Sequence, residues 1–171
     1  SVAQLKYLTD GMKALLPWDE AEEVTFECEP GTLTDDKLQA IRDLGVTRLS
    51  LGVENFDDHI LETNGRAHRS KEVGRAYEFA RAAGFPQINI DLIAGMLEET
   101  EGNWKECVAK AIDMAPDSVT VYQMEIPYNT TIYQRMKEEG KLTAPIADWE
   151  TKRRWTDYAF NELQAAGYAI S

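Results

Sequence analysis

Four short segments of the chain alternate apolar and polar side chains, and each is followed by a longer segment with helical spacing. The predicted strands span residues 23–29, 47–54, 87–93 and 118–125. The predicted helices span residues 3–16, 34–44, 57–63, 70–84, 100–112, 131–139 and 146–166. Because strands and helices alternate over short connections, the pattern predicts an α/β fold with parallel strands and flanking helices in about four βα units.

The predicted strands carry apolar side chains on one face, which right-handed crossovers place against the helices. The members of this face are Leu49, Leu51, Val53, Ile88, Ile90 and Leu92. The other face carries small and polar residues, namely Thr25, Glu27, Ser50, Gly52, Glu54, Asn89 and Asp91. Such a face does not suit the closed apolar lumen of an eight-stranded barrel. It indicates the inside of a wider or incomplete barrel that holds a ligand or water.

The two ends of the chain give further expectations. The first helix has apolar residues at helical spacing, namely Leu5, Leu8, Met12, Leu15 and Leu16. On the final helix, Trp149 and Trp155 are interpreted as packing anchors. Residues 167–171 have the pattern of a further strand that is just beginning.

Three carboxylates occur late on successive predicted strands, all on the polar face: Glu27, Glu54 and Asp91. In parallel α/β architectures, binding sites form at the carboxyl ends of the strands. Three such side chains suit a divalent cation, or the hydroxyls of a ribose together with an ammonium group. Arg66, which follows Gly65 in a loop at the same edge, could hold a ligand carboxylate in a bidentate pair. The alternative is that the acids are simply solvated on the open side of the sheet.

Four other residues with useful chemistry are interpreted as structural from the pattern alone. His59 and His68 fall in helix or loop context, where most histidines lie on the surface. Tyr122 and Met124 belong to the predicted strand at residues 118–125 and would fill the barrel interior.

The composition narrows the class of protein. A chain of 171 residues, 43% apolar and 28% charged, is long enough for one domain with a sizeable core. The net charge of −12 argues against a nucleic-acid backbone or an anionic membrane as the main partner. No apolar run approaches the roughly 20 residues of a membrane span, and residues 1–16 lack a signal-peptide core. Cys28 and Cys107 lie too far apart for a metal-ligand pair, and we expect both to be reduced in a cytoplasmic protein.

An ordered set of segments resembles the radical S-adenosylmethionine (SAM) family of oxygen-independent coproporphyrinogen III oxidase-like proteins. The segments are TFECEPGTLTDDKL, GVTRLSLGVENFDDHIL with GRAH, INIDLIAG, VYQMEIP and GYAIS, and they extend from about Glu23 to the last residue. The resemblance implies a partial (βα)6 barrel of the TIM type that binds SAM and a [4Fe–4S] cluster.

The resemblance also assigns roles to single residues. Glu27 is similar to the acidic position that contacts SAM, Arg66 to the arginine near its methionine carboxylate, and Asp91 to the acid near its ribose. Met124 falls at the position that lies along the cofactor. Glu54 stands where the family usually has glutamine, and GMLEET at residues 95–100 stands where it has GLPGQT.

The cluster ligands of the family are three cysteines spaced CxxxCxxC, and this chain has no such motif. Its four strands are similar to the third to sixth strands of the family barrel. We therefore interpret residues 1–171 as an excised fragment of a partial radical SAM barrel domain, without the first strands and the C-terminal substrate-binding region. The fragment alone is expected to be inactive, and the cluster is expected to be held by ligands elsewhere in the parent protein.

Three functions follow as hypotheses. The first is a radical SAM oxidoreductase of porphyrin biosynthesis, in which a 5′-deoxyadenosyl radical abstracts hydrogen from a porphyrinogen-like substrate. The second is a haem-binding chaperone of the same family. The third is a Mg²⁺ enzyme with Glu27, Glu54 and Asp91 as ligands, which the nearby Arg66 disfavours. The exposed sheet edge where the family's second strand would pair also predicts self-association.

Overall fold

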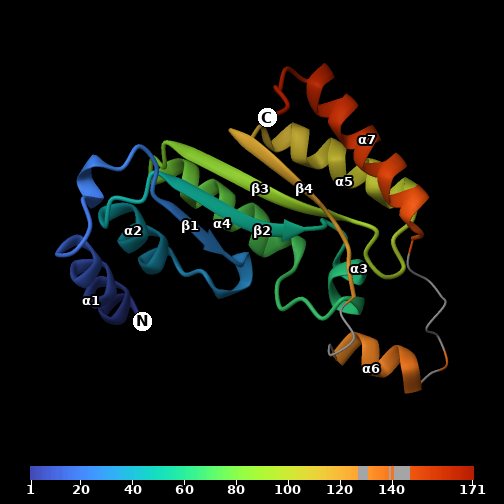
Figure 1. Ribbon diagram of the computed structural model, residues 1–171, viewed down its shortest axis with the longest axis horizontal. Coiled ribbons are helices and arrows are strands. Elements are labelled where there is room, and N and C mark those ends of the chain that lie inside the picture. Colours follow the sequence, from blue (N-terminus) through green and yellow to red (C-terminus); the bar gives the residue numbers. More distant parts are fainter. Residues whose placement is uncertain (127–130, 139, 141–146) are drawn as a thin grey trace.

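The computed structural model describes residues 1–126, 131–138, 140 and 147–171. Four parallel strands form one sheet in chain order: β1 (Thr25–Cys28), β2 (Arg48–Glu54), β3 (Gln87–Ala94) and β4 (Ser118–Gln123) (Figure 1). The helices are α1 (Val2–Lys13), α2 (Asp35–Asp43), α3 (Asp58–Thr63), α4 (Ser70–Ala82), α5 (Glu101–Met114), α6 (Thr131–Glu138) and α7 (Trp149–Ala165). The predicted alternation of strands and helices is present. Residues 139 and 146 of the predicted helices lie outside the described part of the chain.

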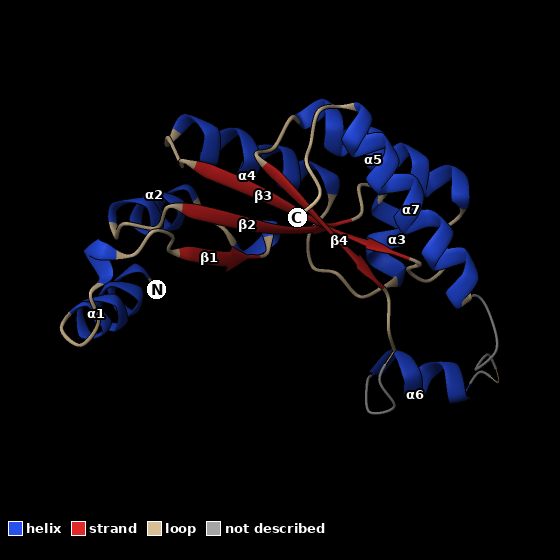
Figure 2. Ribbon diagram, turned by 45° about the horizontal axis from the view of Figure 1, so that its top comes forward, coloured by secondary structure: helices blue, strands red, loops and turns tan. Residues whose placement is uncertain are grey.

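Helices cover one face of the sheet. Figure 2 shows α2, α4 and α5 along this face, with α7 beside α5. The apolar side chains predicted for this face are buried beneath the helices: Leu49, Leu51, Val53, Ile88, Ile90 and Leu92. The prediction of one helix-covered apolar face is therefore confirmed, and the opposite face of the sheet is left to carry the polar side chains.

Local signals in the sequence explain where the helices begin. The side chains of Thr34, Asp57, Thr100 and Asp148 each accept a hydrogen bond from a backbone N–H in the first turn of the next helix. Such caps satisfy N–H groups that have no partner inside the helix. Because α3 and α5 begin in this way directly after the β2 and β3 loops, the carboxyl ends of these strands have defined conformations.

Two tryptophans join α5 to α7. The rings of Trp104 and Trp155 stack with centroids 6.5 Å apart, and Trp104 Nε1 donates to the Trp155 carbonyl at 2.8 Å. Trp155 is buried, as expected of a packing anchor. The same expectation is wrong for Trp149, which is 51% exposed at the first position of α7, with Lys152 Nζ 4.5 Å from the centroid of its ring.

Both ends of the chain differ from the predictions. Helix α1 ends at Lys13 and packs against α2, and Leu8 on this helix is exposed. Leu15 and Leu16 lie beyond its end and are exposed as well. Residues 167–171 form no strand. There, the Tyr168 hydroxyl donates to the Pro116 carbonyl at 2.7 Å and ties the end of the chain to the start of β4.

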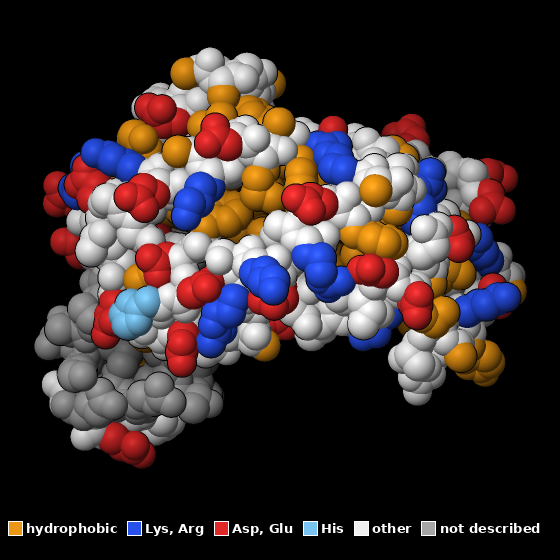
Figure 3. Space-filling model, turned by 180° about the vertical axis from the view of Figure 1, so that it is seen from behind, with side chains coloured by type: hydrophobic (Ala, Val, Ile, Leu, Met, Phe, Trp, Pro, Cys, Tyr) orange, Lys and Arg blue, Asp and Glu red, His pale blue; other side chains and the backbone are white. Residues whose placement is uncertain are grey.

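The surface on the helix side mixes both signs of charge. Figure 3 shows acidic and basic side chains interspersed over this side of the molecule. None of the described helices has the length and apolar content that a bilayer crossing requires.

Candidate functional site

A cavity of about 440 Å³ lies at the carboxyl ends of β1, β2 and β3 on the face without helices. It is lined by Glu27, Cys28, Glu29, Ser50, Gly52, Glu54, Arg66, Asp91, Ile93 and Tyr122. Its volume falls in the range of roughly 300–1,000 Å³ that is usual for small-molecule sites. The four predicted site residues Glu27, Glu54, Arg66 and Asp91 are thus brought to one cavity.

Strand register explains the convergence of the acids. Glu27 of β1 pairs with Ser50 of β2, and Gly52 of β2 pairs with Asp91 of β3. Paired residues of parallel strands point to the same face, so both acids share the open face of the sheet. Gly52 has no side chain between them, which leaves room for a ligand against the backbone.

The Asp91 carboxylate is held by a hydrogen-bond network across β2 and β3. Ser50 Oγ donates to one carboxylate oxygen at 2.8 Å, and Asn89 Nδ2 donates to the other at 2.8 Å. Ser118 and Thr120 of β4 donate to Asn89 Oδ1, which fixes the orientation of that amide. These contacts position Asp91 as an acceptor with lone pairs left for ligand hydroxyls. The sequence placed the residues on one face but did not predict the network.

Glu54 and Arg66 form an ion pair at the rim of the cavity, through Glu54 Oε2 and Arg66 Nε. Their side chains are 14% and 35% exposed. Burial raises the pKa of the Glu54 carboxyl above its ordinary value, although the Arg66 charge opposes the shift. A ligand carboxylate would use the terminal nitrogens of the same guanidinium.

The backbone at Glu54 is unusual. Its φ of 65° lies in the left-handed region, and the ladder between β2 and β3 shifts register between Gly52 and Glu54. Asn55 N–H donates to the Val53 carbonyl at 2.8 Å, so the three residues form a γ-turn of the rare, strained kind. Strain of this kind is concentrated at functional sites.

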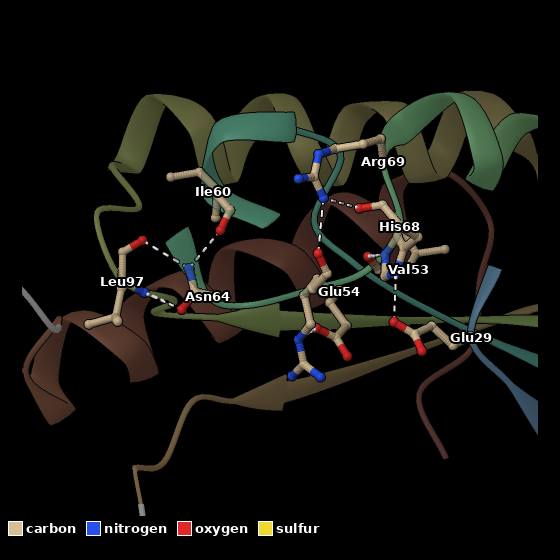
Figure 4. A network of polar contacts seen from close by, with 9 residues as sticks. Glu29, Val53, Glu54, Ile60, Asn64, His68, Arg69 and Leu97 are labelled. Atoms are coloured by element: carbon tan, nitrogen blue, oxygen red, sulfur yellow. Dashed lines mark hydrogen bonds and ion pairs between the residues drawn. The ribbon is translucent and has the colours of Figure 1, made fainter. Parts of the chain in front are cut away.

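The loop that carries Arg66 is organised by its own polar groups (Figure 4). Arg69 Nη1 donates to the carbonyls of Arg66 and His68, at 2.9 Å each. The Asn64 side chain donates to the Ile60 carbonyl and both donates to and accepts from the backbone of Leu97, 33 residues away. The end of α3 is therefore tied to the loop after β3.

His68 is fully buried, so its prediction as a surface residue is wrong. Its Nε2 lies 3.0 Å from the Val53 carbonyl and its Nδ1 lies 3.4 Å from a Glu29 carboxylate oxygen. Both partners are remote in sequence, so spacing alone could not indicate them. His59 matches the expectation, with a side chain that is 72% exposed and that pairs with Glu98.

A carboxylate also holds the loop after β3. Glu99 Oε2 accepts from the Gly95 and Met96 N–H groups at 2.6 and 3.1 Å, and Oε1 accepts from Asn55 Nδ2 at 2.8 Å. Burial outweighs these bonds and raises the pKa of Glu99 to about 7. The preceding Glu98 has a left-handed φ of 63°, where the family segment GLPGQT has glycine.

Six residues of the cavity were not predicted as site residues: Cys28, Glu29, Ser50, Gly52, Ile93 and Tyr122. Burial, with Asp91 and Glu27 nearby, raises the pKa of the Cys28 thiol to about 12, so it is not a ready thiolate. Met124 is not among the lining residues. It is buried, and its carbonyl accepts from Lys152 Nζ at 2.6 Å, so its contact with a cofactor stays a prediction.

A larger cavity, of about 760 Å³, lies at the amino ends of β3 and β4 beside residues 166–171. It lacks the convergent acids and the arginine of the smaller cavity. In parallel α/β folds the carboxyl edge of the sheet is the functional edge. The smaller cavity is therefore the candidate site.

The family model described as the radical SAM superfamily matches residues 6–111, more than half of the chain. The chain belongs to the radical SAM superfamily. The resemblance to this family is thereby confirmed. The match includes the cavity's Glu27, Glu54, Arg66 and Asp91.

Curated relatives of this radical SAM chain include the haem chaperone HemW of Bacillus subtilis, 33% identical and covering 100% of this chain and 45% of the relative. The oxygen-independent coproporphyrinogen III oxidase of Bradyrhizobium diazoefficiens is 31% identical, covering 85% of this chain and 32% of the relative. The structure of coproporphyrinogen III oxidase HemN from Escherichia coli matches with a TM-score of 0.83 at 23% identity, over 99% of this chain and 38% of that one. The predicted fold class is confirmed, and the chain spans less than half the length of these proteins.

The cavity residues fit SAM by their chemistry. The carboxylates of Glu27 and Glu54 suit an ammonium group, Arg66 suits a carboxylate and Asp91 suits ribose hydroxyls.

The cysteines of this chain do not fit a [4Fe–4S] cluster. The two cysteines are Cys28, with its raised pKa, and Cys107, which is buried in α5. Among the described residues, no three His, Cys, Asp or Glu side chains are placed to hold one metal ion, which also leaves the Mg²⁺ hypothesis without a site.

Proposed function

We propose that this chain is the SAM-binding part of a radical SAM protein that acts on a porphyrin-type small molecule. The observation that carries the proposal is the cavity itself, in which Glu27, Glu54, Arg66 and Asp91 meet in a chain of this superfamily. The carboxylates and the guanidinium form a set complementary to an amino acid joined to a nucleoside.

In this proposal Arg66 binds the methionine carboxylate, and Glu27 with Glu54 faces the ammonium group. Asp91, held by Ser50 and Asn89, accepts hydrogen bonds from the ribose hydroxyls. Met124 is assigned a place along the cofactor from the family resemblance alone. The [4Fe–4S] cluster, which supplies the electron for SAM cleavage, is assigned to ligands elsewhere in the parent protein.

The binding step is tested on the chain as it stands. Isothermal titration with SAM and with 5′-methylthioadenosine, which has the nucleoside but not the amino acid, measures the contribution of the amino acid end. We expect SAM to bind more tightly. Equal affinities, or no binding of SAM at millimolar concentration, would contradict the proposed site.

For the parent protein we propose an oxidoreductase similar to oxygen-independent coproporphyrinogen III oxidase. The relative from Bradyrhizobium diazoefficiens, similar over most of this chain, supports this role. The complete protein, reconstituted anaerobically with iron, sulfide and a reductant, should release 5′-deoxyadenosine from SAM and convert a porphyrinogen. Release without porphyrinogen turnover would reject the oxidase role.

The second candidate is a haem chaperone. It is favoured by the similarity to HemW, which extends over 100% of this chain. A chaperone should bind haem stoichiometrically, with a shifted Soret band, and should not convert porphyrinogen. The two experiments on the complete protein therefore separate the candidates.

We also propose a cytoplasmic location and a tendency to self-associate. Both cysteines are free, as in a reducing compartment. Strand β1 pairs only with β2 among the described strands, so its outer edge offers unpaired backbone groups. Light scattering after size exclusion, over a range of concentrations, would detect dimers, and a strictly monomeric chain would reject the association.

A further inference from the structure

We infer that His68 is a positioning residue, which sets the Glu54–Arg66 pair for a ligand without touching the ligand itself. Only the identity of the ligand is taken from the proposed function. The geometry of the buried ring and its partners carries the rest.

The imidazole of His68 joins the ends of two strands. Its Nε2 contacts the Val53 carbonyl of β2, and its Nδ1 contacts Glu29, which follows β1 and lines the cavity. A carbonyl can only accept, so Nε2 carries a proton and donates to it. A fully buried polar ring needs such partners, because an unpaired polar group in the interior is costly.

The carbonyl that His68 binds belongs to the strained turn at Glu54. Val53 O accepts from Asn55 N–H, which closes the γ-turn, and from the His68 ring, which comes from outside it. The Val53 carbonyl and the Glu54 nitrogen share one peptide plane. Fixing that plane fixes the direction in which Glu54 leaves the strand, toward Arg66 and the cavity.

The same residue anchors the partner of Glu54. Arg69 binds the carbonyls of Arg66 and His68 together, so the backbone of Arg66 is tied to that of His68. The backbone of His68 is also closely packed against the segment that follows β1. A Cβ at Gly31 would lie 2.9 Å from His68 Cβ and 3.1 Å from His68 Cα, so a larger residue there would displace His68. His68 therefore fixes both halves of the Glu54–Arg66 pair relative to the sheet.

If His68 only stabilised the fold, its substitution should have a different effect. Its loss would lower stability and weaken every ligand of the cavity alike. A positioning role acts on the amino acid end of the ligand and leaves the nucleoside end unchanged, because Asp91 is held by a separate network.

The experiment compares three variants of the purified chain. His68→Leu removes both ring contacts, whereas His68→Gln keeps an N–H donor near the position of Nε2. His59→Gln changes the exposed histidine and is the matched control. Gly31→Ala, whose methyl group would displace the Cβ and backbone of His68 without removing the ring, replaces His68→Leu if that variant does not melt cooperatively.

The first measurement needs no ligand. The Nε–H proton of Arg66, assigned by its loss in Arg66→Lys, should be resolved in the ¹⁵N NMR spectrum because this nitrogen is buried and forms an ion pair with Glu54. We expect the signal to persist in His68→Gln and His59→Gln and to disappear in His68→Leu. An unchanged signal in His68→Leu would overturn the inference whatever the chain binds.

The second measurement is the ratio of the dissociation constants for SAM and 5′-methylthioadenosine. We expect His68→Leu to weaken SAM about tenfold, the worth of one well-placed hydrogen bond, and to leave the nucleoside unchanged. His68→Gln should restore most of the affinity. Equal weakening of both ligands would overturn the positioning role, and absence of SAM binding by the unsubstituted chain would instead reject the proposed function, with the NMR result still deciding the inference.

Discussion

Replacement of Glu99 by glutamine should abolish a pH dependence of stability that this residue imposes on the fold. Burial raises the pKa of Glu99 to about 7 from an ordinary value of 4.5. The folded chain thus binds a proton more tightly than the unfolded chain does. The free energy of unfolding should fall as the pH rises from about 4.5 to about 7 and should be level above pH 8.

The magnitude follows from the difference between the two pKa values. Each pH unit of difference is worth about 1.4 kcal/mol, so ionised Glu99 costs about 3 kcal/mol of stability at pH 8 relative to pH 4. This energetic cost is an upper value, because the loop after β3 can relax and expose the Glu99 carboxylate to water. The three hydrogen bonds to the carboxylate are already included in the pKa, and they do not overcome the burial.

Glu99→Gln removes the charge and keeps the shape. The Asn55 amide cannot turn to accommodate it, since Asn55 Oδ1 accepts from Asp57 N–H at 2.9 Å. The new amide N–H₂ therefore faces the Asn55 N–H₂ group, and the variant loses one hydrogen bond, worth about 1 kcal/mol at every pH. The variant should be less stable than the parent near pH 5 and more stable near pH 8.

Urea unfolding followed by circular dichroism at intervals from pH 4.5 to 8.5 measures this crossing. The difference between parent and Glu99→Gln isolates one group, because the other titrating residues cancel. Glu106→Gln, on the exposed side of α5, is the control and should leave the slope of the parent unchanged. A difference that changes by less than about 0.5 kcal/mol over this range would refute the reasoning.

Three further predictions concern the cavity and the core. Arg66→Met should weaken SAM by about tenfold or more and leave 5′-methylthioadenosine unchanged in titration calorimetry, because only SAM has a carboxylate; equal losses would contradict the assignment. Asp91→Asn turns an amide toward the Ser50 hydroxyl and should weaken both ligands, with a loss of about 1 kcal/mol in unfolding by urea. Trp104→Phe should lower the free energy of unfolding by about 2 kcal/mol, because the bond to the Trp155 carbonyl and buried volume are lost; a value near zero would show that α7 does not depend on this contact.

The fold was predictable because its information is local. Alternation along β2 and β3 placed Leu49 and Ile88 under the helices, and the structure buries both. Caps such as Thr34 and Thr100 likewise act within one helical turn. The apolar spacing of α1 was equally regular, yet Leu8 and Met12 are exposed, because periodicity shows that an apolar face exists and not what covers it.

Only the part of the site that depends on the alternation of side chains along regular strands could be predicted. Glu27 and Asp91 lie on the open face because each belongs to a regular strand. His68 was placed on the surface because its partners, Val53 and Glu29, are 15 and 39 residues away and no local pattern marks them. Contacts of that range exist only after the strands have assembled.

Glu54 shows that a correct prediction can rest on an incomplete reason. Alternation from Ser50 through Gly52 assigns Glu54 to the polar face, but the ladder shifts register at that point and Glu54 has a left-handed backbone. Its carboxylate reaches Arg66 because of the turn that closes on the Val53 carbonyl. Regular strand alternation therefore places Glu27 and Asp91 in the cavity, whereas a strained turn held by buried contacts places Glu54. A substitution that relaxes the turn should alter the amino acid end of the cavity before it alters the fold.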